Sequence, residues 1–240
     1  MSEGTPARIT ILYDNTAHAP GARADWGFAC LIETGGRRVL FDTGADGGIL
    51  RANADTLSAP LAGLDAVVLS HEHWDHTAGL DAVLAENQGV AVYLVTDSPR
   101  KLADRIAEGG GRAVPVGEAR EIAPGLWTTG QVGGGIPEQA VILETGAGLV
   151  VATGCSHPGI VEMVRAAAAA REGTLRLALG GFHLMDRNAG EVAATIAALR
   201  DLELARVAPS HCTGDAAVAA FREAWGGNCL ALGAGRILEF

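Results

Sequence analysis

Short apolar runs and alanine-rich runs alternate along the chain. The apolar runs are rich in Val, Ile and Leu and are bounded by Gly, Asp and Thr, which is typical of buried strands. They predict strands at residues 8–13, 28–33, 37–41, 66–69, 90–95, 140–144, 148–152, 176–179 and 206–208. The alanine-rich runs predict helices at residues 45–54, 78–87, 99–108, 159–170, 189–202 and 215–225. This alternation indicates one α/β domain over residues 1–240.

Two segments of the chain resemble each other. LIETGGRRVLFDTG at residues 31–44 and ILETGAGLVVATG at residues 142–154 both predict a strand, a Glu-Thr-Gly turn, a second strand and a Thr-Gly loop. A helical run follows each of them. The repeat predicts a pseudo-symmetric pair of sheets with helices outside, and both Thr-Gly loops would emerge at the same edge. The alternative is that any two hairpins share such features.

The composition narrows the classes of function. The chain has 240 residues, of which 48% are hydrophobic, and a formal net charge of −10. No cluster of lysine and arginine stands out, which argues against a sequence-independent nucleic-acid surface and against docking on an anionic membrane. We therefore expect a small-molecule substrate and neither a nucleic-acid nor a membrane partner, while the oligomeric state stays open.

The N-terminal stretch and the cysteines bear on the compartment. MSEGTPARITILYD has no basic region followed by a long apolar run, and no stretch approaches the roughly 20 apolar residues of a membrane span. The cysteines are scattered without a CxxC pair, which does not indicate a disulfide framework in a chain of this size. They are Cys30, Cys155, Cys212 and Cys229. We expect a cytoplasmic protein.

The segment LSHEHWDHTAGL at residues 69–80 concentrates metal-binding side chains. His71 and His73 are two residues apart at the end of a predicted strand, so their side chains point the same way. Asp75 and His76 follow in the turn, and such side chains are natural ligands of Zn²⁺ and other borderline divalent ions. The chain can thus aim His71 and His73 at one ion and Asp75 and His76 at a second. A solvated polar turn, the alternative, requires a coincidence of four residues.

The run Ser70-His71-Glu72-His73-Trp74-Asp75-His76 resembles the HxHxDH signature of the metallo-β-lactamase superfamily. The resemblance implies a four-layer αββα sandwich with the metal site at one edge of two sheets, and the internal repeat fits that architecture. It also implies two divalent metal ions, with Zn the first expectation and Mn or Fe as alternatives. The run Phe41-Asp42-Thr43-Gly44 resembles the first conserved loop of the superfamily, in which the Asp supports the site.

Three further histidines lie at predicted strand-to-loop junctions, in GCSH, GGFH and SHCTG. His211 matches the last ligand histidine of the superfamily and would serve the second ion. Cys155 stands where most hydrolytic members carry a bridging Asp. Its thiolate could bind the second ion, or it could be an unreactive buried thiol.

One stretch departs from the superfamily pattern. Hydrolytic members usually carry a Pro-Gly-His-Thr-type loop before the strand that leads to the bridging Asp, whereas residues 128–140 here contain no histidine. The first ion therefore lacks its usual third imidazole. His157 could replace it and is favoured over the alternative, Glu138.

The three motifs, together with Tyr13-Asp14-Asn15-Thr16, resemble a subgroup of the superfamily. That subgroup includes archaeal 7,8-dihydropterin-6-methyl-4-(β-D-ribofuranosyl)aminobenzene-5′-phosphate synthases and bacterial metal-dependent hydrolases. The resemblance implies that His183 is a substrate-facing or acid–base residue and that Asn15 lines the pocket. A core histidine and an ordinary Asx turn are the alternatives. Asn15, Glu138 and His183 are the candidates for substrate contacts.

These patterns lead to three hypotheses. In the first, a metal-dependent hydrolase uses a metal-bound hydroxide, oriented by Asp75, to attack a small ester, lactone or phosphoester. In the second, the same metal site supports a pterin-type condensation between a dihydropterin and an aminobenzene ribosyl phosphate. In the third, the chain is a non-catalytic, metal-bound ligand sensor.

Overall fold

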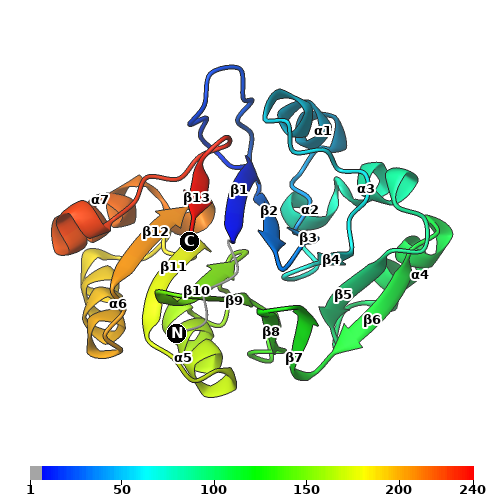
Figure 1. The fold of residues 1–240 in the computed structure, drawn as a ribbon. Helices are drawn as coiled ribbons and strands as arrows, with labels where there is room; N and C mark the ends of the chain where they lie inside the picture. Colours follow the sequence, from blue (N-terminus) through cyan, green and yellow to red (C-terminus); the bar gives the residue numbers. More distant parts are fainter. Residues whose placement is uncertain (1–6) are drawn as a thin grey trace.

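Two β-sheets form the centre of the computed structural model, which describes residues 7–240 (Figure 1). Within these residues the first sheet has the strand order β13-β1-β2-β3-β4-β5-β6, and the second has the order β12-β11-β10-β9-β8-β7. The first sheet is built from β1 (Arg8–Tyr13), β2 (Ala29–Thr34), β3 (Arg37–Phe41), β4 (Ala66–Val68), β5 (Ala91–Val95), β6 (Arg112–Val116) and β13 (Ile237–Glu239). The second is built from β7 (Glu118–Ala123), β8 (Leu126–Gly130), β9 (Val141–Thr145), β10 (Gly148–Thr153), β11 (Leu175–Gly181) and β12 (Arg206–Ser210).

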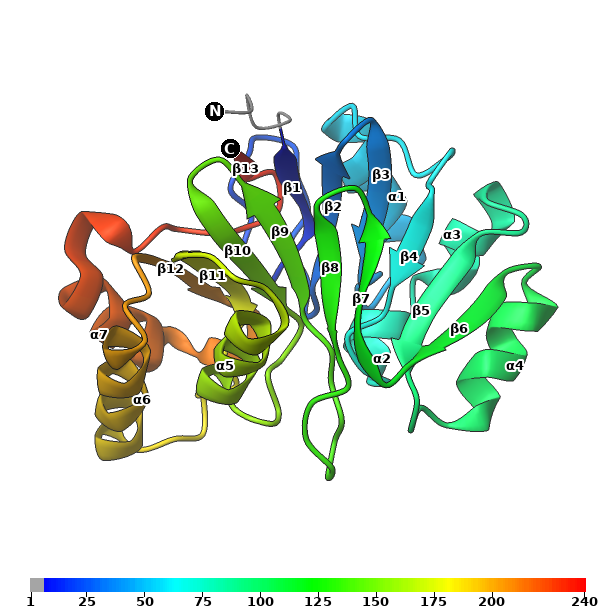
Figure 2. The same ribbon diagram turned by 60° about the horizontal axis from the view of Figure 1, so that its bottom comes forward.

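Helices cover the outer face of each sheet. The first sheet carries α1 (Gly47–Thr56), α3 (Leu80–Glu86) and α4 (Arg100–Glu108), and the short α2 (Trp74–Thr77) follows β4. The second sheet carries α5 (Ile160–Ala170), α6 (Ala189–Asp201) and α7 (Asp215–Trp225). Figure 2 shows the two groups of helices on opposite sides of the paired sheets. The result is the predicted four-layer αββα sandwich.

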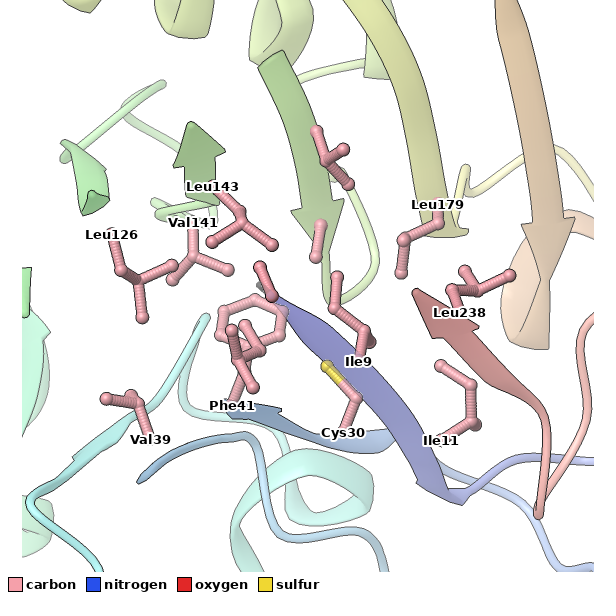
Figure 3. Close-up of a cluster of buried hydrophobic side chains, with 14 of the residues drawn as sticks. Ile9, Ile11, Cys30, Val39, Phe41, Leu126, Val141, Leu143, Leu179 and Leu238 are labelled. Carbon is pink, nitrogen blue, oxygen red and sulfur yellow. The ribbon is translucent and has the colours of Figure 1, made fainter. Parts of the chain in front are cut away.

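Alternating side chains produce three hydrophobic cores from these four layers. Ile9, Cys30 and Phe41 point from the first sheet toward the second, where they meet residues such as Val141 and Leu179 (Figure 3). The intervening residues of the same strands face the helices and form a separate core on each outer side. Because strand side chains alternate between faces, each strand that is buried on both sides must be apolar along its length. This explains the continuous apolar runs in the sequence.

The two sheets repeat one pairing pattern, which confirms the symmetry predicted from the internal repeat. In the first sheet β1, β2 and β3 pair antiparallel, and β4 and β5 then continue in parallel. In the second sheet β8, β9 and β10 pair antiparallel, and β11 and β12 continue in parallel. The two matching sequence segments form the β2–β3 and β9–β10 hairpins. Their Thr-Gly ends therefore lie in equivalent places.

Some elements differ from the sequence prediction. The strands β6, β7, β8 and β13 were not predicted; β6, β7 and β13 lie at sheet edges, and the residues of β7 are mostly exposed. An edge strand buries little surface, so it lacks the apolar run that marks a central strand. The helix expected at residues 78–87 is present as α3, from Leu80 to Glu86. A separate short helix that was not predicted, α2, precedes it and contains the motif residues Asp75 and His76.

Among the described residues, no helix combines the length and the hydropathy that a membrane span requires. The first six residues, which belong to the stretch examined for a signal segment, lie outside the described residues.

Candidate metal centre

The candidate site lies where parallel strands of both sheets end. The segments that carry the predicted residues follow β4, β10, β11 and β12. Because the carboxyl ends of parallel strands meet at one edge of a sheet, these segments converge although they are far apart in the sequence. Two groups of ligand atoms result, which we call the first and the second metal position.

The first metal position consists of His71, His73 and His157, and one ring nitrogen from each of them lies within 4.8 Å of the others. The three imidazole rings are packed edge to face, with centroids 4.6–4.8 Å apart. His71 is buried, and the other two are partly exposed. The structure thus places His157 in the group that the HxH pair of the motif begins.

Glu138 lies behind His157 and outside the ligand groups. Its carboxylate accepts hydrogen bonds from the backbone N–H of Ser156, at 2.8 Å, and of His157, at 2.9 Å, and it also bonds to His157 Nδ1. Burial by itself would raise the pKa of Glu138, but the nearby imidazoles of His71 and His157 outweigh it and lower the pKa to about 2. An ionised Glu138 fixes the ring of His157 and leaves Nε2 as its ligand atom. Glu138 is fully buried, so in this structure its side chain is not open to a substrate. Its role as a substrate contact stays a prediction.

The second metal position consists of Asp75, His76, Cys155 and His211, all buried, with ligand atoms within 4.8 Å of one another. His76 Nε2 lies 3.2 Å from Cys155 Sγ, and His211 Nε2 lies 3.3 Å from Asp75 Oδ2. The ring centroids of His71 and His76 are 4.3 Å apart, so the two metal positions adjoin each other. The Cys155 thiol thus faces the same point as the acid and the imidazoles of this group.

Hydrogen bonds on the inner ring nitrogens fix how the histidines face the site. His76 Nδ1 bonds to Asp42 Oδ2 at 2.7 Å. Ser70 Oγ donates to the same carboxylate at 2.7 Å, so it can accept from His71 Nδ1, which is 2.9 Å away. With Asp42 ionised, both rings carry their protons on Nδ1 and present an unprotonated Nε2. His71 Nε2 is buried and has no hydrogen-bond partner within residues 7–240, as expected for an atom that binds a metal ion.

The electrostatics of the two groups also favour cation binding. Burial lowers the pKa of His76 to about 4 and holds that of His71 well below its usual range, so both imidazoles are neutral near pH 7. Burial would raise the pKa of Asp75, but the neighbouring His211 and His76 outweigh it and bring it below its ordinary value. Neutral imidazoles and an ionised carboxylate are the forms that bind divalent metals.

The two halves of the molecule touch directly beneath the site. A Cβ atom added to Gly154, in the Thr-Gly loop after β10, would lie 2.1 Å from Ser70 Oγ and 2.9 Å from Asp42 Oδ2. Only glycine fits such a close approach. Burial holds the pKa of Asp42 well above its usual range even though Ser70 donates two hydrogen bonds to it.

Asn15 and His183 lie at opposite sides of the site. Asn15 Oδ1 accepts from His211 Nδ1 at 2.9 Å and from the Gly27 N–H at 3.1 Å, so the side chain is placed behind His211. His183 is partly exposed, and its ring centroid is 4.3 Å from that of His157. His157 and His183 line a cavity of about 220 Å³, which Asn15 does not border. The substrate roles of Asn15 and His183 stay predictions.

Two contacts with the site were not foreseen from the sequence. The indole N–H of Trp26 donates to Asp75 Oδ2 at 2.8 Å, although the two residues are 49 positions apart. Cys212 is buried, and its Sγ lies 3.5 Å from the backbone oxygen of Cys155. The sequence could have indicated that Cys212 lies near the site, because it directly follows His211. No local pattern connects Trp26 with Asp75.

Comparison with known proteins identifies the family. Residues 37–224 match the family described as the β-lactamase superfamily domain. The chain belongs to this superfamily. Its members include metal-dependent hydrolases, and the two metal positions described above form the corresponding candidate site.

Relatives within the β-lactamase superfamily cover nearly the whole chain. The chain is 27% identical to a 7,8-dihydropterin-6-methyl-4-(β-D-ribofuranosyl)-aminobenzene-5′-phosphate synthase of Methanocaldococcus jannaschii, over 89% of this chain and 88% of the relative. It is also 27% identical to Tm1679, whose crystal structure is described as that of a metal-dependent hydrolase of the superfamily. That match has a TM-score of 0.81 and covers 98% and 99% of the two chains. YhfI from Bacillus subtilis shares the fold, with a TM-score of 0.70 at 14% identity, over 98% of this chain and all of YhfI.

Proposed function

We propose that the protein is a metal-dependent enzyme that hydrolyses a small ester, lactone or phosphoester. The observation that carries this proposal is the pair of adjoining metal positions, linked by the 4.3 Å contact between the rings of His71 and His76. Zn²⁺ is the first choice because imidazole and thiolate suit it, with Mn²⁺ and Fe²⁺ as alternatives.

The donor atoms of the chain fit two divalent ions. His71, His73 and His157 would hold one ion, and Asp75, His76, Cys155 and His211 would hold the other. Such ions, when bound, lower the pKa of water and stabilise negative charge that develops on the substrate. The fit rests on the unprotonated Nε2 atoms and on the buried, unpartnered Nε2 of His71.

The remaining groups would position the reaction. The indole N–H of Trp26 donates to Asp75 Oδ2 and holds the carboxylate that we propose to orient the attacking water. His183, beside His157 in the 220 Å³ cavity, lies where a substrate group could be reached. We propose that His183 protonates the leaving group, which is one form of the substrate-facing or acid–base role that the family resemblance implies.

A condensing synthase is the second candidate, and the specific observation that favours it is the match to the Methanocaldococcus jannaschii synthase over most of both chains. A condensation would use the same two metal positions but would displace a leaving group from a pterin instead of adding water. Members of one fold family differ in chemistry while sharing the metal-binding residues, so the site alone does not select between the two reactions.

The experiment that tests the proposal combines metal counting with product analysis. Protein purified without oxygen is analysed for bound metal and then incubated with lactones, carboxylic esters and phosphodiesters, and separately with a dihydropterin diphosphate and an arylamine. Hydrolysis that is lost on chelation and restored by Zn²⁺ or Mn²⁺ supports the hydrolase. A pterin–arylamine adduct in its place selects the synthase, and tight binding without turnover on either set contradicts an enzymatic role.

His71→Ala serves as the matched variant in this experiment, because it removes a ligand of the first metal position. Turnover that survives in His71→Ala with unchanged metal content would show that the activity comes from elsewhere.

A further inference from the structure

Cys155, His183 and Cys212 form a third group of metal-binding atoms, next to the two metal positions. One ligand atom from each lies within 4.8 Å of the other two. We refer to these residues as the thiol cluster. We propose that the thiol cluster is a third metal-binding position, for a thiophilic divalent ion such as Zn²⁺, that shares Cys155 with the second metal position.

The donor set suits zinc. Two cysteines and one histidine are the protein ligands of an open zinc site, in which the fourth position is left for water or substrate. With Zn–S bonds of about 2.3 Å, two thiolates on one tetrahedral ion stand about 3.8 Å apart, so ligand atoms within 4.8 Å need to move little. Sulfur has several lone pairs, which allows the Cys155 thiolate to face both positions.

His183 contributes the observation that separates this group from an ordinary pair of core thiols. Its Nδ1 atom is buried and has no hydrogen-bond partner within the described part of the chain. A buried polar atom without a partner costs free energy unless a ligand satisfies it. The rest of the His183 ring borders the 220 Å³ cavity, so the open coordination position could face that cavity.

The backbone around the thiol cluster is shaped to leave room for it. A Cβ atom on Gly181 would lie 2.7 Å from Cys212 Sγ and 3.2 Å from the Cα of Cys155. His183 and His211 have positive φ angles of 50° and 49°, a conformation that non-glycine residues adopt at a cost and mostly at functional sites.

Hydrogen bonds then lock the two loops together. The N–H groups of Leu184 and Met185 donate to the carbonyl of Cys212 at 3.2 and 3.3 Å. The N–H of Phe182 donates to Thr213 Oγ1 at 3.0 Å. The loop after β11 and the loop after β12 are therefore held in register, which preorganises the ligand atoms for an ion.

The test counts ions in four proteins. Wild type, Cys212→Ser, His183→Asn and Cys229→Ser are purified under reducing conditions, stripped of metal and reloaded with Zn²⁺ or Co²⁺. Asn is chosen at position 183 because it tolerates positive φ. Cys229 is a half-buried thiol outside the cluster and serves as the matched control.

We expect Cys212→Ser and His183→Asn each to bind one ion fewer per chain than wild type and Cys229→Ser. With Co²⁺, the absorption from thiolate-to-cobalt charge transfer should fall in Cys212→Ser but not in Cys229→Ser. Circular dichroism identifies a variant that has failed to fold. If Cys212→Ser does not fold, His183→Asn still tests the proposal, because His183 is partly exposed and its replacement should disturb the core less.

Unchanged metal content and an unchanged cobalt spectrum in both cluster variants would overturn the proposal. A wild-type total of two ions, unaffected by either variant, would leave the two-position hydrolase intact and remove only the thiol cluster. A bound ion would also occupy the imidazole of His183, so a confirmed third position would replace the acid–base role predicted for that residue.

Discussion

The two halves of the molecule contribute to the metal centre in different ways, although their sheets repeat one pattern. The first half supplies His71, His73, Asp75 and His76 from six consecutive positions after β4. The second half supplies its ligand atoms from separate places: Cys155 and His157 after β10, and His211 after β12. Each half also contains a buried carboxylate, Asp42 or Glu138, that holds an imidazole by Nδ1.

This difference shows that neither half by itself contains all the ligand atoms of the first or of the second metal position. The first metal position combines His71 and His73 with His157, and the second combines Asp75 and His76 with Cys155 and His211. The ligand atoms meet only when the sheets pack face to face, and Gly154 allows that approach. Metal binding and the packing of the two halves should therefore be coupled.

The largest expected loss of bound metal and of turnover comes from removing one imidazole of the first metal position, whether it belongs to the first half or to the second. His71→Ala and His157→Ala should each lower the bound metal by one ion per chain and reduce turnover by about a thousandfold, since a bound ion supplies several kcal/mol of catalysis. Elemental analysis and steady-state kinetics measure both. His18→Ala, in an exposed loop, is the control. Full metal content in His157→Ala would contradict the shared position.

Chelation should destabilise the whole molecule, because each ion at the proposed positions would join ligand atoms of the two halves. Removal of an ion present at 100–1,000 times its Kd lowers the free energy of unfolding by about 3–4 kcal/mol. For a chain of this size that corresponds to a fall in Tm of roughly 10 °C for each ion. Calorimetry with and without chelator, followed by metal addition, measures it. An unchanged Tm would mean that the halves pack independently of metal.

The buried histidines of the two halves should give the metal-free protein opposite responses to pH. The pKa of His76 is lowered by burial from 6.5 to about 4. Between these values the unfolded chain binds a proton that the native chain does not, so stability falls as the pH falls from 6.5 to 4, by about 3 kcal/mol.

For His211, burial would lower the pKa, but the interactions with Asp75, Cys212 and Asp14 together outweigh burial, and the pKa is raised. Its contribution to stability is therefore present below pH 6.5 and is lost as the pH rises above it. Denaturant unfolding of metal-free wild type, His76→Gln and His211→Gln measures both effects. His76→Gln should remove the acid-side loss, and equal pH profiles for the two variants would contradict the assignment.

Replacing either of the two buried carboxylates, Asp42 or Glu138, should have the smallest effect, a loss of about 10- to 100-fold in metal affinity. Glu138→Gln should weaken only the first metal position, because Glu138 holds His157. Asp42→Asn should weaken both positions, because Asp42 bonds to His76 directly and to His71 through Ser70. Competition with a chelator of known affinity measures each ion. Glu144→Gln, in the ion pair with Arg171, is the control, and equal losses in all three variants would contradict this division.

The fold could be predicted largely from the sequence because its central strands are buried on both faces. The runs that form β1–β5 and β9–β12 are mostly apolar, and the repeated hairpin predicted the symmetry. The strands β6 and β7 were missed because edge positions impose no such pattern, and Pro115 within β6 argues against a strand. The helical start of α2 was missed because its residues were assigned to a turn.

By itself, the sequence determined those ligand candidates of the centre that lie close together in the chain. His71, His73, Asp75 and His76 lie on one loop, so their spacing fixes which of them can face one ion. Only the tertiary structure decided the partners of these residues. The order of the strands within each sheet turned Glu138 toward His157 and away from the ligand groups, brought Trp26 to Asp75 and set Cys212 beside Cys155. Packing of the second sheet against the first placed Asn15 behind His211. Such contacts join residues far apart in sequence, and their geometry depends on strand order and sheet packing, which no local spacing contains.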